Sequence, residues 1–159
     1  MLNGRIYAIG GDTNVFGSPT PQTTVEGWQP PATGWIDAGI ADLPMACDES
    51  QAFPFENGPL GGDIVFAYCG QWPNAVPDTL LYDTLRNTWS TVGALNHNRR
   101  NAAGAFVPGN QRMLVFGGYG SPSSFLDPIR TVEAGKPGAS GRGGRAIPPP
   151  GQVRTPPAA

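Results

Sequence analysis

The chain has 159 residues, of which only 14% are charged, and its formal net charge is −2. A charge balance this mild argues against nucleic-acid binding by the folded part, and the longest apolar runs are too short to cross a membrane. The 23 glycines and 18 prolines approach the level at which disorder is considered, and they are densest after residue 134.

Three short apolar runs predict strands that end at a glycine pair or its remnant. The first is Ile6–Ile9, which leads into Gly10–Gly11. The second, 65–68, reaches Gly70 with Cys69 in place of the first glycine, and the third, 113–116, reaches Gly117–Gly118. Glycine at a strand end permits a positive φ or a close backbone contact. Strands that recur about every 50 residues are typical of a radial all-β array.

Aromatic residues repeat with the same period. Trp28 and Trp35 are seven residues apart, as are Tyr82 and Trp89, and the two pairs are offset by 54 residues. The step Ala52-Phe53 returns as Ala105-Phe106. Because several landmarks agree, the sequence predicts an internal repeat in which loop lengths vary and strand cores keep their places.

The copies are unequal in their predicted strands. The second is whole, with strands near 52–55, 64–68, 79–83 and 89–92. The third has 102–107 and 112–116, joined by the short turn Pro108–Gln111, and a degenerate third strand within 125–133. The first lacks the strand that should precede Ile6. We therefore expect two to three antiparallel four-stranded sheets, incomplete at both ends.

These motifs resemble the kelch repeat, in which one strand ends at Gly-Gly and a later one at Tyr-Asp, with Trp about six residues on. Residues 102–118 match the first half and 80–89 the second half almost in full. The resemblance spans about residues 3–120 and implies a kelch-like partial β-propeller with blades at about 3–46, 47–95 and 96–134. Closed propellers have four to eight blades. The motif residues are Gly10, Gly11, Gly70, Gly117, Gly118, Tyr82, Asp83, Trp35 and Trp89.

Two of these motif types have clear structural roles. Trp35 and Trp89 are expected to fill space between neighbouring sheets, with indole N–H groups that need partners. The Asp83 carboxylate is expected to accept backbone N–H groups of the turn 84–87.

The remaining segment, 135–159, is mostly Gly, Pro, Arg, Ala and Ser, and we expect a disordered or extended tail. The tail has an excess of positive charge, from Lys136, Arg142, Arg145 and Arg154. RNA binding by the tail is therefore an alternative to a tail that is simply solvated.

The two cysteines lie at neighbouring positions of the predicted hairpin. If Ala52 faces Phe66, as Ala105 faces Leu114, then Cys69 faces Glu49, two residues from Cys47. A disulfide between Cys47 and Cys69 is then allowed. Two unconnected thiols, one of them buried at a glycine position, are the alternative.

The sequence contains few groupings of residues that could catalyse a reaction or bind a metal. We therefore expect that the chain is not an enzyme and has no metal or cofactor. His97 is the single histidine, and no Cys or second His stands at ligand spacing from it. The kelch resemblance invites comparison with galactose oxidase, whose copper site needs more than one histidine. Asp48 and Glu49 are adjacent acids, and we interpret them as part of a solvated loop.

Binding is expected in the loops between strands, which gather at the two ends of such arrays. For Trp72 and Tyr119 the alternative is packing at the rim of the neighbouring sheet. For the arginines the alternative is a structural role, which the kelch resemblance favours. The candidate binding residues are Trp72, Tyr119, Arg99, Arg100, Asp48 and Glu49.

The predicted function is a non-catalytic interaction module that binds a protein partner or a second copy of itself, with carbohydrate as a further ligand class. One alternative is a fragment of a secreted carbohydrate-binding or galactose-oxidase-like propeller protein, and another is a truncated product without a function of its own. No signal peptide precedes Ile6, which predicts the cytoplasm if the N-terminus is native.

Overall fold

The computed structural model describes residues 2, 4–14, 17–18, 20–55, 63–66, 68–70, 75–120, 128–135 and 145–147, with the backbone alone at 63–66 and 145–147. Over these residues the protein is all-β, with ten strands and one short 3-10 helix, η1 (Pro108–Asn110). The strands are β1 (Ile6–Ile9), β2 (Val25–Trp28), β3 (Ala52–Phe55), β4 (Asp63–Phe66), β5 (Asp78–Asp83), β6 (Thr88–Ala94), β7 (Ala103–Val107), β8 (Arg112–Phe116), β9 (Val132–Gly135) and β10 (Arg145–Ile147).

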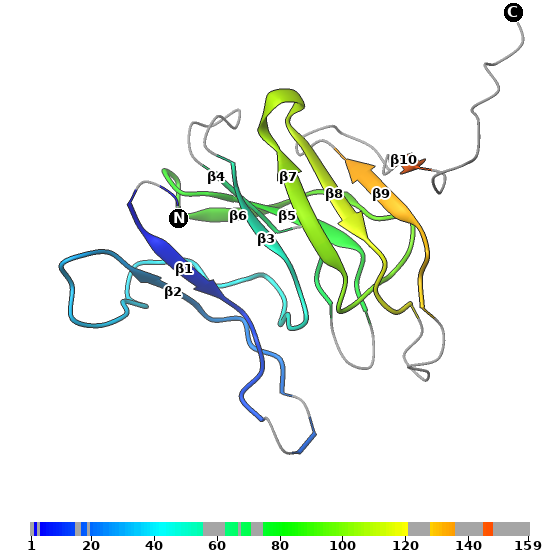
Figure 1. The fold of residues 1–159 in the computed structure, drawn as a ribbon. Coiled ribbons are helices and arrows are strands. Elements are labelled where there is room, and N and C mark those ends of the chain that lie inside the picture. Colours follow the sequence, from blue (N-terminus) through cyan, green and yellow to red (C-terminus); the bar gives the residue numbers. More distant parts are fainter. Residues whose placement is uncertain are drawn as a thin grey trace, which may run out of the picture.

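The strands form three antiparallel sheets that follow one another along the chain (Figure 1). The first sheet holds β1 and β2, the second β3 to β6, and the third β7 to β10. Each strand pairs only with its neighbours in sequence, as short connections favour. The prediction of an all-β fold built from small antiparallel sheets is confirmed.

The predicted register of the leading hairpins is also confirmed. Ala52 pairs with Phe66, and Ala105 pairs with Leu114. In the third sheet the hairpin turn is η1, after which Gln111 adopts a φ of 54° and donates its backbone N–H to the carbonyl of Pro108. A shift of the β7–β8 pairing by one residue would move the buried side chains of β8 to the other face of the sheet. The burial of these side chains therefore favours the same register as the turn at η1.

Strand β5 is buried on both faces, which explains its run of consecutive apolar residues, Leu80, Leu81 and Tyr82. Leu80 and Tyr82 point toward the first sheet, where they join clusters that contain Val25 and Leu2. Leu81 points the other way and joins the core shared with the third sheet. Because successive side chains of a strand alternate, this one strand contributes to both cores.

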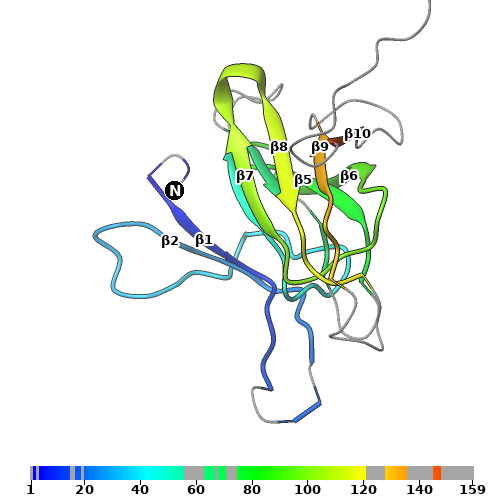
Figure 2. The ribbon, with the colours of Figure 1, turned by 45° about the vertical axis from the view of Figure 1, so that its right-hand side comes forward.

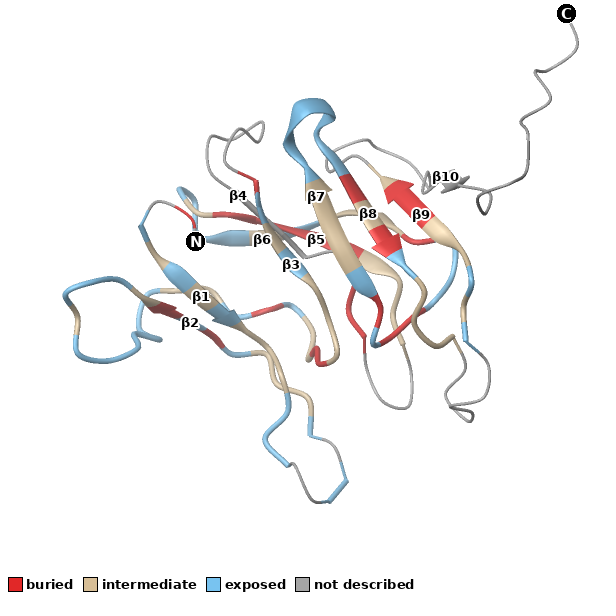
Figure 3. Ribbon diagram, in the orientation of Figure 1, coloured by how far each residue is buried: buried red, intermediate tan, exposed pale blue. Residues whose placement is uncertain are grey.

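The second sheet therefore lies between the other two (Figures 1 and 2). Strands β1, β4 and β8 occupy equivalent positions, since each leads to the glycine landmark of its copy. A strand precedes and pairs with β4 and with β8, whereas in the described part of the chain none does so for β1. Strand β1 carries no buried residue, unlike β5 and β8 (Figure 3).

The third copy departs from its predicted bounds in two places. Its third strand, expected within 125–133, is β9 at Val132–Gly135. Arg145–Ile147, expected to belong to an irregular tail, pairs with β9 as β10. Backbone pairing satisfies N–H and C=O groups without requiring large apolar side chains, so the composition of this segment did not reveal it. The other residues of 136–159 lie outside the described part.

Candidate functional site

The first and third sheets each turn one face away from the second sheet. On β1 the alternate side chains Ile6 and Ala8 point outward, and Ile6 is 41% exposed. On the third sheet Phe116, which is 38% exposed, shares its outward face with Ala103, its pairing partner. We call these surfaces the N-face (Ile6, Ala8 and Trp28) and the C-face (Ala103, Val107 and Phe116).

The N-face continues into a free strand edge. Gly10 donates its backbone N–H to the carbonyl of Thr24 at 2.9 Å, so the alternate residues of β1 bond toward β2. The intervening residues, Tyr7 and Ile9, therefore direct their N–H and C=O groups to the opposite side. No strand of the described residues pairs there. Such a row of backbone groups is a template for a further strand.

An apolar pocket of about 440 Å³ marks the junction of the second and third sheets. Phe53 and Phe55 of β3 line one side of this pocket, and Phe106 of β7 lines the other. The rings of Phe55 and Phe106 meet edge to face, with centroids 5.2 Å apart. The leading strands of these two sheets thus present an apolar surface at their junction.

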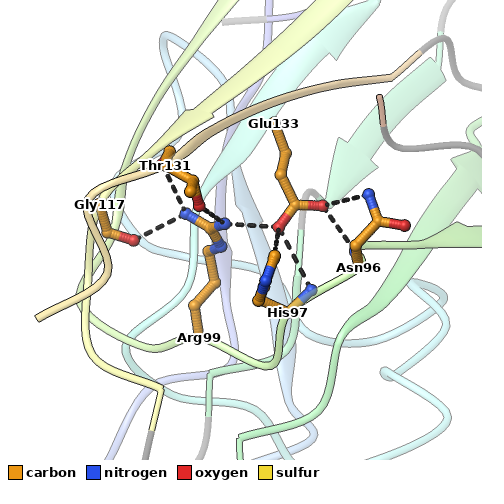
Figure 4. Close-up of polar contacts among 6 residues, drawn as sticks. All are labelled: Asn96, His97, Arg99, Gly117, Thr131 and Glu133. Carbon is orange, nitrogen blue, oxygen red and sulfur yellow. Dashed lines mark hydrogen bonds and ion pairs between the residues drawn. The ribbon is translucent and has the colours of Figure 1, made fainter. Parts of the chain in front are cut away.

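A buried polar cluster ties the loop before β7 to strand β9 (Figure 4). Arg99 Nη2 donates to Glu133 Oε1, and Arg99 Nη1 donates to the carbonyl of Gly117 at 2.8 Å. The side chains of Arg99 and Glu133 are fully buried. The prediction that Arg99 is a loop residue available to ligands is therefore wrong, and the alternative of a structural arginine describes it.

The donors around Glu133 keep it ionised. Burial is the largest influence and opposes ionisation, but hydrogen bonds from the Asn96 backbone and Arg99, the charge of Arg99 and a bond from His97 outweigh it. The pKa of Glu133 consequently lies below its ordinary value. His97 Nδ1 lies 3.1 Å from Glu133 Oε1, with its ring half-exposed (Figure 4). The single histidine thus serves as one more partner of a structural carboxylate.

Arg100 connects the second and third sheets. Its backbone N–H and C=O pair with those of Tyr119, both at 3.0 Å, and its Nη1 lies 3.4 Å from Glu49 Oε2. The Tyr119 ring centroid is 5.8 Å from Arg100 Cζ, which is cation–π geometry. Arg100 is buried, which contradicts its prediction as an exposed binding residue, and Tyr119 packs at the rim. Trp72 lies outside the described residues.

Asp48 is buried and only 5% exposed, so its interpretation as part of a solvated loop is wrong. Its backbone N–H donates to the carbonyl of Gly70 at 3.0 Å, which fixes the residue against the end of the second sheet's leading hairpin. Burial, followed by the charges of Glu49 and Asp12, raises the pKa of Asp48 to about 6. The sequence predicted the pairing position of this residue but contained no signal for its depth.

Cys47 and Cys69 form a disulfide, and both are fully buried between the first and second sheets. The pairing of Asp48 with Gly70 places Cys47 beside Cys69, as the predicted register requires. The alternative of two free thiols is therefore wrong.

The glycine landmarks permit close approach of two chain segments. Gly118 has a φ of 86°, and a Cβ there would lie 2.6 Å from the Arg100 carbonyl oxygen. Gly10 approaches the carbonyl of Cys47 more closely still. Gly70 packs in the same way, with 2.6 Å between a Cβ and the carbonyl oxygen of Glu49. Gly11 and Gly117 also have positive φ.

The second half of the motif behaves as predicted in the second sheet and not in the first. Trp89 Nε1 donates to the carbonyl of Ala41 at 2.9 Å, and its ring stacks on Tyr82 with centroids 4.8 Å apart. Asp83 Oδ1 accepts the backbone N–H groups of Leu85 and Arg86 at 2.9 and 3.0 Å. Trp35, predicted to be buried between sheets, is 50% exposed.

Comparisons with known proteins identify a fold but no family. No family model matches the chain, and no curated protein matches its sequence. Among solved structures it is similar to YjhT, with a TM-score of 0.72 over 96% of this chain and 13% sequence identity. The aligned region is 51% of YjhT, so the chain spans about half the length of that protein.

No group of three or more His, Cys, Asp or Glu side chains among the described residues could hold a metal ion. No helix in that part of the protein is long and apolar enough to cross a membrane.

Proposed function

We propose that the chain is a non-catalytic, kelch-type interaction module whose three sheets are consecutive propeller blades, and that it binds a second copy of itself to close a ring. The observation that carries this proposal is the pair of exposed, largely apolar surfaces, the N-face and the C-face, at opposite ends of the row of sheets. Each also carries one exposed charge, Glu26 beside Ala8 on the N-face and Arg112 beside Val107 on the C-face. Burying such surfaces is the main favourable term in protein association.

A second copy suits these surfaces for two reasons. When the N-face of one copy meets the C-face of the other, each copy covers both open ends of its partner, and the ring closes after two chains. The alignment with YjhT supports a ring of two chains. It covers 51% of YjhT, so two copies of this chain are about as long as one YjhT chain. The free edge of β1 would then lie at the new junction.

Light scattering after size exclusion tests the proposal. A chain of 16.6 kDa should elute as a species of about 33 kDa at micromolar concentration. Phe116→Lys should shift the population toward monomer by placing a charge on the C-face. Leu85→Lys is the matched control, because Leu85 is 75% exposed in the turn between β5 and β6 and belongs to neither face. A folded wild-type monomer across all concentrations would overturn the proposal.

The second candidate is a part of a secreted carbohydrate-binding or galactose-oxidase-like propeller protein. The disulfide favours it, because such bonds persist mainly in oxidising compartments. Titration with galactose and related monosaccharides, followed by NMR, tests this candidate. Specific shifts at loop residues of a monomeric chain would favour it over self-association.

A further inference from the structure

The pocket beside Asp48 lies where the end of β1 meets the segment that leads into β3. It has a volume of about 270 Å³. Tyr7, Ile9 and Ala52 give it apolar walls, and the acidic residues Asp48 and Glu49 also line it. None of the interactions proposed for ring closure uses these two carboxylates.

Asp48 is held firmly but incompletely satisfied. Its backbone pairs with Gly70, and the preceding residue, Cys47, is fixed by the disulfide. Its Oδ1 is buried without a hydrogen-bond partner among the described residues. A buried carboxylate oxygen without a donor costs free energy, so a ligand that supplies a donor and a positive charge would be stabilised here.

Three charged groups face Asp48 from different segments. Glu49 follows it in the chain, Asp12 comes from the loop after β1, and Arg100 comes from the loop before β7. Arg100 Nη1 also lies 3.4 Å from Glu49 Oε2, so this cation is shared between two acids. The surroundings of Asp48 therefore hold more negative than positive charge, which is the condition for binding a cation.

We propose that this pocket binds a guanidinium or primary ammonium group on a short aliphatic chain, with Asp48 as the buried counter-ion and Glu49 beside it. The apolar walls would cover the methylene groups of such a ligand while the cationic end reaches the carboxylate. Two sources share this chemistry: a free aliphatic amine, or an arginine or lysine side chain of a peptide.

Binding of agmatine, followed by NMR chemical shifts of the folded protein, tests the proposal. Affinity should fall about tenfold from pH 7.5 to pH 5, because Asp48 gains a proton as the pH falls through about 6. Asp48→Asn should weaken agmatine binding at pH 7.5 at least tenfold. Asp37→Asn is the matched control, since it removes an exposed acid that does not line the pocket.

A carboxyl-detected titration of Asp48 provides a second measurement that needs no variant. Saturating agmatine should lower the pKa of Asp48. Equal agmatine affinity in wild type and Asp48→Asn, or affinity that does not change between pH 5 and 7.5, would overturn the proposal. A capped peptide with one arginine distinguishes the sources. Tighter binding than agmatine supports a peptide ligand, and equal binding supports recognition of the cationic group alone.

Discussion

Arg99 and Glu133 form an ion pair in which both side chains are fully buried, and it joins the loop before β7 to strand β9. Burying two charges is costly, and further hydrogen bonds to each partner offset part of that cost. The carbonyl of Gly117 and the backbone of Asn96 supply such bonds. The loop between β6 and β7 is thus held to the third sheet by a contact between residues 34 positions apart.

Removing the charge of Glu133 should be strongly destabilising. In Glu133→Gln the Arg99 guanidinium stays buried without a counter-ion, which should cost about 3–5 kcal/mol of unfolding free energy. Urea unfolding at pH 7 measures the change. Asp37→Asn, which removes an exposed acid of the segment between β2 and β3, should leave the free energy nearly unchanged. Equal values for the two variants would show that the buried pair contributes nothing to stability.

The same residue predicts the sign of the acid response. The pKa of Glu133 in the folded protein lies below its ordinary value of 4.5, so the ionised form is favoured by folding. Its contribution is therefore complete above pH 4.5 and is lost as the pH falls through the lower, folded-state value. Between pH 5 and 3, wild type should lose more stability than Glu133→Gln. Parallel curves for the two proteins would contradict this assignment.

Reduction of the disulfide should destabilise the junction of the first and second sheets. Cys47 and Cys69 are 22 residues apart, and closing a loop of this length contributes about 3 kcal/mol in the chain-entropy model. Urea unfolding with and without reductant measures this difference, and the double variant Cys47→Ser, Cys69→Ser should not respond to reductant. Two thiols that react under denaturing, non-reducing conditions would show that the bond is absent.

The two repeat tryptophans should respond differently to the same substitution. Trp89→Phe removes the donor to the Ala41 carbonyl and part of the stacking on Tyr82, so it should cost about 1–3 kcal/mol. Trp35→Phe changes a side chain that is 50% exposed and should cost less than about 0.5 kcal/mol. Hydrogen exchange at residues 40–42 should accelerate only in the Trp89 variant. The opposite order would place Trp35 at the inter-sheet contact.

Features that depend on neighbours within one hairpin could be predicted well. The match of Ala52-Phe53 to Ala105-Phe106 predicted the pairing of Ala52 with Phe66, and from that pairing the proximity of Cys47 and Cys69 followed. Asp83 was predicted to accept N–H groups of its own turn, and it does so. In each case the partners are set by strand register or by a few consecutive residues, both of which leave a periodic trace in sequence.

The exposure of the candidate site residues was predicted less well, because a residue's exposure depends on which distant segments of the chain pack over it. Arg99 and Arg100 were proposed for the surface, yet β9 and the segment at Glu49 supply buried partners for them. Asp48 was assigned to solvent and is buried, and Trp35 was assigned to the core and is half-exposed.

The sequence by itself determined the all-β character, the strand repeat and the hairpin registers, since apolar periodicity and glycine positions encode local backbone geometry. Only the tertiary structure decided which charged groups are buried and which apolar faces stay open. The counter-ion of Arg99 is Glu133, which lies 34 residues later in the chain on β9, and no local sequence pattern predicts this pairing. The burial of a charge reflects the balance between desolvation and its assembled partners, and that balance exists only once the sheets have come together.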